Sequence, residues 1–240
     1  MHAILEPKRF QHLAAAALPW LSGLTLVAFG MGLYFALLAS PPDYQQGETV
    51  RIMYVHVPSA WMSMMAYGAM ALFSALYLVW KHPTAALAAK ALAPIGLVFT
   101  GLALVTGSIW GKPTWGAWWV WDARLTSVLV MFFIYLGYVA LWRALGDGLS
   151  AAKASSILAL VGVINLPIIK FSVEWWTTLH QGPSVLRLEG PAIDPSMLRP
   201  LLVMAGASFL YMAAVFVARF DAELKAARVE KLLRERAKGG

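Results

Sequence analysis

The segment ALAPIGLVFTGLALVTGSIWGKPTWGAWWVWD, residues 91–122, sets the character of this chain. Its first part, from 91 to 111, is an uncharged apolar run long enough to cross a bilayer as a helix, which takes about 20 residues. Its last part, residues 110–122, holds five of the 11 tryptophans together with two glycines, a proline and a terminal carboxylate. Tryptophan is large, flat and amphipathic, so this cluster belongs either to a membrane-interface belt or to a platform for a flat ligand.

The composition extends the membrane assignment to the whole chain. Of 240 residues, 60% are hydrophobic and 13% are charged, and the mean hydropathy is +0.67. A soluble domain of this size has no core large enough to hide so many apolar side chains. The uncharged runs predict six transmembrane helices, over about residues 18–40, 55–80, 90–110, 124–142, 154–173 and 199–219. Pro94 predicts a kink in the third helix, and Asn165 and Pro167 interrupt the fifth.

Basic residues are distributed unevenly over the connections between these helices. Thirteen of the 19 Lys and Arg lie at the N-terminus, in the second and fourth connections and in the tail. The other six are Arg51, Lys112, Arg124, Lys170, Arg187 and Arg199. The positive-inside rule therefore predicts that both termini are cytoplasmic and that three loops face outward. The net charge of +7 resides on the inner face and favours anionic lipid or a cytoplasmic partner, not nucleic acid.

The predicted architecture is an all-α integral membrane protein in a single domain. We expect residues 1–219 to form the six-helix membrane domain, with the tryptophan-rich loop 110–122 between the third and fourth helices on the outer side. Residues 220–240 form a basic cytoplasmic tail. Oppositely charged residues four apart, Asp221 with Lys225 and Glu230 with Arg234, predict that this tail continues the sixth helix.

Several chemistries require residues that this chain does not have. The absence of cysteine excludes disulfides and thiolate metal ligands. Residues 107–114, GSIWGKPT, lack the G-x-x-x-x-G-K-[ST] spacing of a phosphate-binding loop, and no H-E-x-x-H zinc signature is present. No Ser, His and Asp arrangement for nucleophilic catalysis is evident. We therefore expect a binding protein, with no catalytic residues of its own.

Two histidines flank the tryptophan loop in sequence and fall on the same predicted membrane face. His56 begins the second span in YVHVPSAW, and His180 lies in the third outer loop in EWWTTLHQGPSV. Two imidazoles beside an aromatic surface are what a planar metalloporphyrin requires, with an axial nitrogen on each side of the iron and apolar contact for the ring. A single interfacial histidine is more often a hydrogen-bonded structural residue, so the metalloporphyrin interpretation depends on the presence of both histidines.

Charged residues near the platform suit the propionates of such a ligand. Arg51 precedes His56 by five residues and Arg124 follows Asp122 by two, and a guanidinium can hold a carboxylate at two points. The alternative for both arginines is snorkelling to the membrane interface. Asp122 stands at the start of the fourth span, where we expect it to cap the helix.

At this point the motifs resemble a known family. The segment WGKPTWGAWWVWDARLTS is similar to the tryptophan-rich WWD signature of haem-handling proteins. With YVHVPSAWM, EWWTTLHQGPSV, the length and the six spans, the whole chain resembles the cytochrome c maturation protein C family, also called haem exporter protein C. The resemblance implies haem b (iron protoporphyrin IX) ligated by His56 and His180. It also implies a platform of Trp115, Trp118, Trp119 and Trp121, with Asp122, Arg51 and Arg124 beside it.

The resemblance also implies partners and a location. The family works in the bacterial inner membrane, in a complex with an ATP-binding cassette ATPase subunit, a second six-span membrane subunit and a small single-span membrane subunit. It presents haem at the periplasmic face to a haem chaperone, cytochrome c maturation protein E. ATP hydrolysis is expected in the separate ATPase chain.

Two further interpretations of the tryptophan loop remain open from the sequence. One is a haem-free membrane scaffold that seats a periplasmic partner on the loop, since aromatic side chains are also favoured at protein interfaces. The other is a quinone-binding redox subunit, which uses a flat ligand but gives no reason for paired outer histidines. An absorbance spectrum of the purified chain separates the three.

Overall fold

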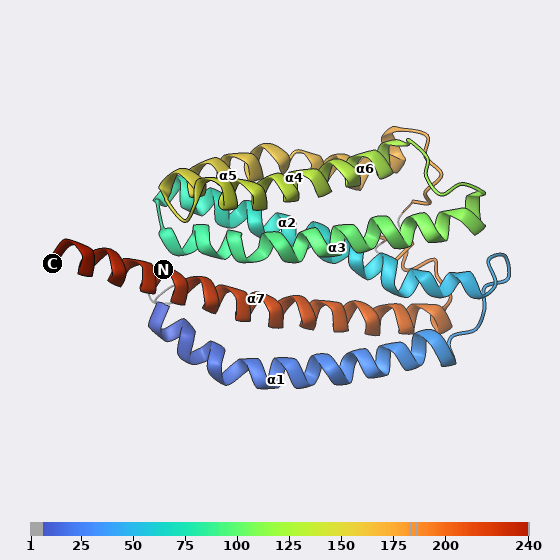
Figure 1. Ribbon diagram of the computed structural model, residues 1–240. Coiled ribbons are helices and arrows are strands. Elements are labelled where there is room, and N and C mark those ends of the chain that lie inside the picture. Colours follow the sequence, from blue (N-terminus) through green and yellow to red (C-terminus); the bar gives the residue numbers. More distant parts are fainter. Residues whose placement is uncertain (1–6, 183, 186, 240) are drawn as a thin grey trace.

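The computed structural model describes residues 7–182, 184, 185 and 187–239, and these form an all-helical bundle (Figure 1). Its α-helices are α1 (Pro7–Tyr34), α2 (Met53–Trp80), α3 (Pro83–Trp115), α4 (Ala123–Leu145), α5 (Leu149–Gly162), α6 (Asn165–Trp175) and α7 (Pro195–Gly239). A π-helix, η1 (Phe35–Ala39), prolongs α1, and a 3₁₀-helix, η2 (Glu48–Ile52), leads into α2. Within the described residues, six helical stretches are long and apolar enough to cross a membrane, which confirms the predicted number.

The helices pack in three groups (Figure 1). α1 and α7 lie side by side along one edge, α4, α5 and α6 lie along the opposite edge, and α2 and α3 pack together between them. The end of α7 and the start of α1 lie at one end of the bundle, and the connections 41–47 and 116–122 lie at the other, together with the described residues of the connection 176–194. All the sequence-predicted site residues therefore belong to elements that reach one end, because the connections after the first, third and fifth spans lie on the same side of the bundle. Which compartment this end faces stays a prediction from the charge distribution.

The fifth span is broken where the sequence predicted an interruption. α5 ends at Gly162 and α6 begins at Asn165, because Pro167 has no N–H to donate to the Val163 carbonyl. The Leu166 N–H donates to that carbonyl instead, at 3.0 Å. The Asn165 side chain donates to the Ser127 carbonyl of α4 at 2.7 Å, so the break is fixed against the bundle and α6 is placed independently of α5.

The predicted boundary of the tryptophan loop needs correction. We expected a loop over residues 110–122, but α3 continues through Pro113 to Trp115, so only residues 116–122 connect α3 to α4. The helix stops at Gly116, which adopts a φ of 76° and donates its N–H to the Lys112 carbonyl. A side chain at this left-handed position would be strained, which is why a glycine ends the helix. Trp115 is consequently held by a helix rather than by a loop.

α7 continues as a helix far beyond its apolar part, as the charge pattern predicted. Lys225 pairs with Asp221 at 2.6 Å, and Arg234 pairs with Glu230. Near the start of this extension Glu223 binds Lys90 of α3 at 2.7 Å, and Lys90 also binds Asp147 at 2.6 Å. These contacts hold the extension in line with the bundle.

Small residues allow the central helices to approach closely, as in other membrane bundles. Tyr135 of α4 is fully buried and donates its hydroxyl proton to the Ser63 carbonyl of α2 at 2.9 Å. A Cβ at Gly96 of α3 would overlap that phenol ring. Tyr67 of α2 and Gly162 of α5 make an equivalent contact on the other side of the core.

Substitution of Gly96 by Ala should destabilise the bundle, because the added methyl group displaces Tyr135. We expect the free energy of unfolding to fall by about 1–3 kcal/mol, the usual cost of overpacking a core. Titration of the protein in bicelles with a denaturing detergent measures this difference. Gly68→Ala is the matched control, since nothing lies within 4 Å of a Cβ at Gly68. Equal effects of the two substitutions would contradict the described packing.

Candidate functional site

His56 lies in the first turns of α2, with its imidazole against α3. Its Nδ1 lies 3.2 Å from the Thr106 hydroxyl, and its ring meets the Trp110 indole edge-on with centroids 5.7 Å apart. A Cβ at Gly107 would lie 2.8 Å from Cε1 of His56, so the absence of a side chain there makes room for the ring. The imidazole is thus seated on α3 by Thr106, Gly107 and Trp110.

His180 lies in the connection between α6 and α7 and packs on the end of the same helix. Its ring meets the Trp115 indole edge-on, with centroids 4.8 Å apart. The Trp115 ring in turn lies over Gly111, where a Cβ would be 3.3 Å from Cε3 of the indole. Gly107 and Gly111 are four residues apart and therefore share one face of α3, about 6 Å apart along its axis. The tertiary structure thus gathers both histidines on one helix face, and His180 is an electrostatic neighbour of His56.

Asp122 has two functions at this point. One carboxylate oxygen accepts the Leu125 N–H at 2.8 Å and caps α4, which confirms the predicted cap. The other, Oδ2, lies 3.5 Å from Nδ1 of His180, which is too long for a hydrogen bond. Both atoms are buried and neither has a hydrogen-bond partner among the described residues. A small rotation of either side chain would pair them.

The environment of His180 favours a neutral imidazole. Burial lowers the pKa of His180, and the nearby Arg124 guanidinium lowers it further, whereas the Asp122 carboxylate opposes both effects. A neutral ring keeps a nitrogen lone pair, which a metal ligand must offer. Among the residues that the structure describes, no group of three or more His, Asp or Glu forms a metal-ion cage, so any metal chemistry here rests on the two imidazoles.

The four predicted platform tryptophans differ in exposure. Trp115 and Trp119 are half-buried, whereas Trp118 is 57% and Trp121 is 75% exposed. The loop is folded back along α3 by the Ser108 hydroxyl, which donates to the Trp118 carbonyl at 2.8 Å. Trp119 and Trp121 meet edge-on, with centroids 5.5 Å apart. Of the four, Trp115 alone contacts a histidine ring, whereas Trp118 and Trp121 present exposed indole rings from the loop that follows α3.

The Arg124 guanidinium lies close enough to both histidines to interact electrostatically with each imidazole. Its Nε donates to the Ser172 hydroxyl at 3.1 Å, and its Nη2 donates to the Ile169 and Lys170 carbonyls at 3.3 and 3.4 Å. The residue thus joins α4 to α6 and places a positive charge behind the site.

Arg51 has a different environment from the one the sequence predicted. Its Nη1 donates to the carbonyls of Ala36, at 3.0 Å, and Leu37, and its Nε binds Glu48. These are groups of η1 and η2, and the structure gives it no hydrogen bond to either histidine. The guanidinium terminates η1 by satisfying carbonyls that have no helical partner. Helix η2 turns Arg51 toward η1, and its expected contact with a propionate stays a prediction.

Two aromatic residues beside the site were not among the predicted ones. Trp175 ends α6 and Trp176 follows it toward His180, and the two side chains are 56% and 50% exposed. Trp175 stacks on Phe171, with centroids 5.3 Å apart and an interplanar angle of 26°. The paired tryptophans in EWWTTLHQGPSV were a visible signal, since they precede His180 in the same outer segment.

Comparison with known proteins identifies the family to which this chain is similar. A sequence model of the family described as Heme exporter protein C matches residues 1–235. Heme exporter protein C of Bradyrhizobium diazoefficiens is 55% identical over 229 residues, which is 95% of this chain and 87% of that protein. The protein of the same description in Escherichia coli strain K12 is 50% identical, over 84% of this chain and 81% of its own length. A putative cytochrome c biosynthesis ccmC-like mitochondrial protein of Marchantia polymorpha is 52% identical, over 78% of each chain.

Replacement of Gly107 by Ala should displace the His56 imidazole, because the new methyl group would lie within van der Waals contact of the ring. We expect a changed ¹⁵N resonance of the His56 imidazole and a loss of about 1–3 kcal/mol in unfolding free energy. Gly101→Ala, on the same helix, is the control, since its nearest neighbour is Phe132 at an ordinary 3.4 Å. An unchanged His56 resonance in Gly107→Ala would show that the ring lies elsewhere.

Proposed function

Since this chain belongs to the Heme exporter protein C family, we propose that it holds haem at the loop-bearing end of its bundle, with His56 and His180 as axial ligands, for delivery to a haem chaperone. The family serves haem delivery for cytochrome c maturation, and the chain is a multi-pass membrane protein that handles its cargo rather than transforming it. The observation that carries the proposal is the pair of imidazoles on one face of α3. They come from segments 124 residues apart in sequence.

The residues around His180 fit this cargo. An iron-ligating histidine usually donates its second ring N–H to a carboxylate, which fixes the ring and increases its basicity. The unpartnered Oδ2 of Asp122 faces the unpartnered Nδ1 of His180, and this contact would leave Nε2 for the iron. On this proposal Asp122 orients the ligand through one oxygen while the other caps α4.

The tryptophans and Arg124 would provide the rest of the binding surface. Trp115, Trp118, Trp119 and Trp121 offer apolar faces to the porphyrin ring. Burying a propionate without a partner is costly, and Arg124 is the cation near both histidines. Arg51 would need to leave its η1 acceptors to take the second propionate. Two imidazole ligands favour a low-spin iron whose potential the surrounding charges adjust.

Delivery requires partners, and these belong to the proposal as well. We expect the chain to work with an ATP-binding cassette ATPase subunit, a second six-span membrane subunit and a small single-span membrane subunit. The site would face the periplasm in the bacterial inner membrane and meet the chaperone there. ATP hydrolysis in the partner would favour release by changing the relative affinity of two states by a few kcal/mol.

One observation favours a second candidate function. Trp118 and Trp121 are largely exposed, which suits a protein interface as well as a cargo platform. On this alternative the chain is a haem-free scaffold that docks a periplasmic protein through its tryptophan loop. The scaffold would keep its partner complex in the absence of any haem absorbance.

The first test is the absorbance spectrum of the purified protein from haem-sufficient cells. We expect a Soret band that disappears in His56→Ala and in His180→Ala, because each removes one of the two iron ligands. His12→Ala is the control, since His12 is exposed on α1 at the opposite end of the bundle. Haem binding that survives both site substitutions would sink the proposal, and a colourless but intact partner complex would favour the scaffold.

Asp122→Asn tests the second function of that carboxylate. Asparagine also caps helices, so α4 should keep its start while His180 loses its charged partner. We expect haem affinity to fall by about 10–100-fold, the usual effect of losing a partner of a ligating histidine. The reduction potential and the g-values of the ferric haem should shift in the protein that remains loaded. Unchanged affinity and spectra would show that Asp122 acts only as a cap.

A further inference from the structure

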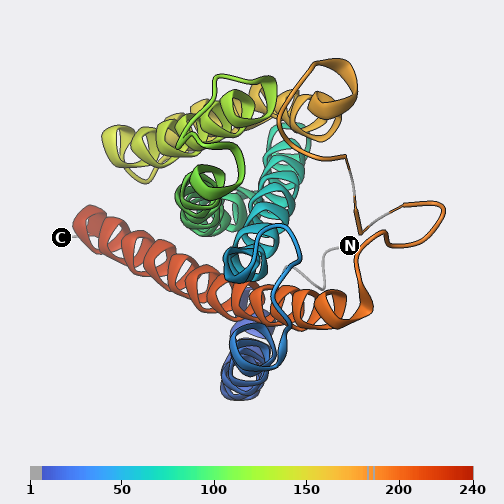
Figure 2. The ribbon, with the colours of Figure 1, turned by 90° about the vertical axis from the view of Figure 1, so that its right-hand side faces the viewer.

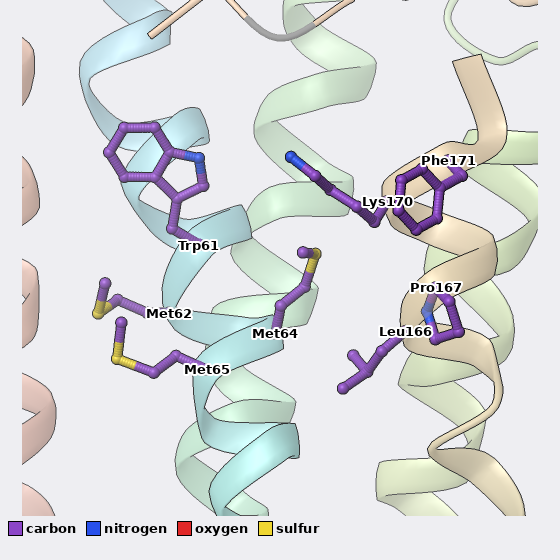
Figure 3. Close-up of a pocket in the computed structure, with 8 residues that line it drawn as sticks. All are labelled: Trp61, Met62, Met64, Met65, Leu166, Pro167, Lys170 and Phe171. Carbon is purple, nitrogen blue, oxygen red and sulfur yellow. The ribbon is translucent and has the colours of Figure 1, made fainter. Parts of the chain in front are cut away.

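A groove opens on the side of the bundle between α2 and α6 (Figure 3). Its volume is about 510 Å³, within the range of small-molecule pockets. Trp61, Met64 and Met65 line it from α2, and Pro167, Lys170 and Phe171 line it from α6. Met65 and Phe171 are 46% and 37% exposed, so the groove opens sideways, toward the lipid chains of a surrounding membrane. It exists because α5 packs against α2, whereas α6, beyond the break before Asn165, packs against α4.

Lys170 is an unusual residue at this position. It belongs to a membrane-spanning stretch, Leu149–Trp175, and forms no ion pair with any of the described residues. Figure 3 shows its ammonium group directed across the mouth of the groove toward the Trp61 indole. A charge inside a membrane span is costly and marks a functional path or an anionic partner. The occupant of this groove should therefore carry an anionic group on an apolar body.

Both walls of the groove lead to the histidine site. Trp61 follows His56 by five residues on α2, which is about 7.5 Å along the helix axis. On the other wall, Phe171 stacks on Trp175, and the Trp175 ring lies 5.7 Å from that of Trp176, four residues before His180. Arg124, the electrostatic neighbour of both histidines, binds the backbone of the same α6 segment. The two helices that line the groove, α2 and α6, thus also lead toward the histidine site.

We propose that this groove admits haem to the histidine pair laterally, from the membrane, with Lys170 receiving a propionate at its mouth. The inference rests on the haem-holding function proposed above and adds the route by which the cargo arrives. Aromatic and thioether side chains suit a flat apolar edge, and methionine adapts its shape to what passes. Passage through the centre of the bundle is opposed by its packing, where Tyr67 and Tyr135 are completely buried.

The test measures the rate at which haem loads into the purified protein in nanodiscs, followed by the Soret band. Met64→Trp fills the groove, and Lys170→Gln removes its charge. We expect each substitution to slow haem loading by about tenfold, while the final spectrum matches that of the wild type. For Lys170→Gln this factor corresponds to the loss of one charge-assisted contact. Val161→Trp, on the exposed face of α5, and Arg199→Gln, an exposed cation at the outer end of α7, are the matched controls.

The outcomes separate the route from the site. Loading at the wild-type rate in Met64→Trp and Lys170→Gln overturns the route, even where the histidine variants confirm the site. A phospholipid that copurifies with the wild type and is lost in Lys170→Gln, with haem loading unchanged, also overturns it and assigns the groove to lipid. A Soret band that persists in His56→Ala and His180→Ala instead refutes the site on which the route depends.

Discussion

The close approach of α2 to α3 at Gly107 is the contact on which the site depends. No side chain larger than hydrogen fits between α3 and the His56 ring, and one turn later Gly111 gives the same room to Trp115, which supports His180. Two imidazoles from distant parts of the chain therefore pack on the same helix, α3 (Figure 2 shows this end of the bundle). A close helix contact at glycine leaves little room for movement, so the backbone, and not flexible side chains, sets the positions of both imidazole rings.

The polar groups around the histidines are shared between structure and chemistry. Asp122 caps α4 and faces His180, and Arg124, two residues later, connects α6 to α4. In a low-dielectric environment an unpaired carboxylate or guanidinium is expensive, so groups that serve two purposes reduce the number of charges that must be buried. For the same reason, residues at the start of α4 contact the loop, the broken fifth span and the site together.

The interruption of the fifth span has consequences beyond local geometry. Pro167 ends the regular hydrogen bonding of α5, Asn165 fixes the break to α4, and α6 then packs along α4. The groove with Lys170 results from this placement. Irregular backbone at membrane depth requires polar partners for its freed groups, and here the Leu166 N–H and the Asn165 side chain provide two such hydrogen bonds.

The sequence determined the six spans, the break at Asn165, the Asp122 cap and the helical tail, because hydropathy, proline and charges four residues apart act locally. It also indicated His56, His180 and the tryptophan segment as candidates, since they fall on one side of the predicted topology. The tertiary structure alone decided that Trp115 belongs to α3, that Arg51 binds η1, and that Asp122 faces His180. These depend on contacts between residues far apart in sequence, and the distance between two side chains is fixed only when helices pack.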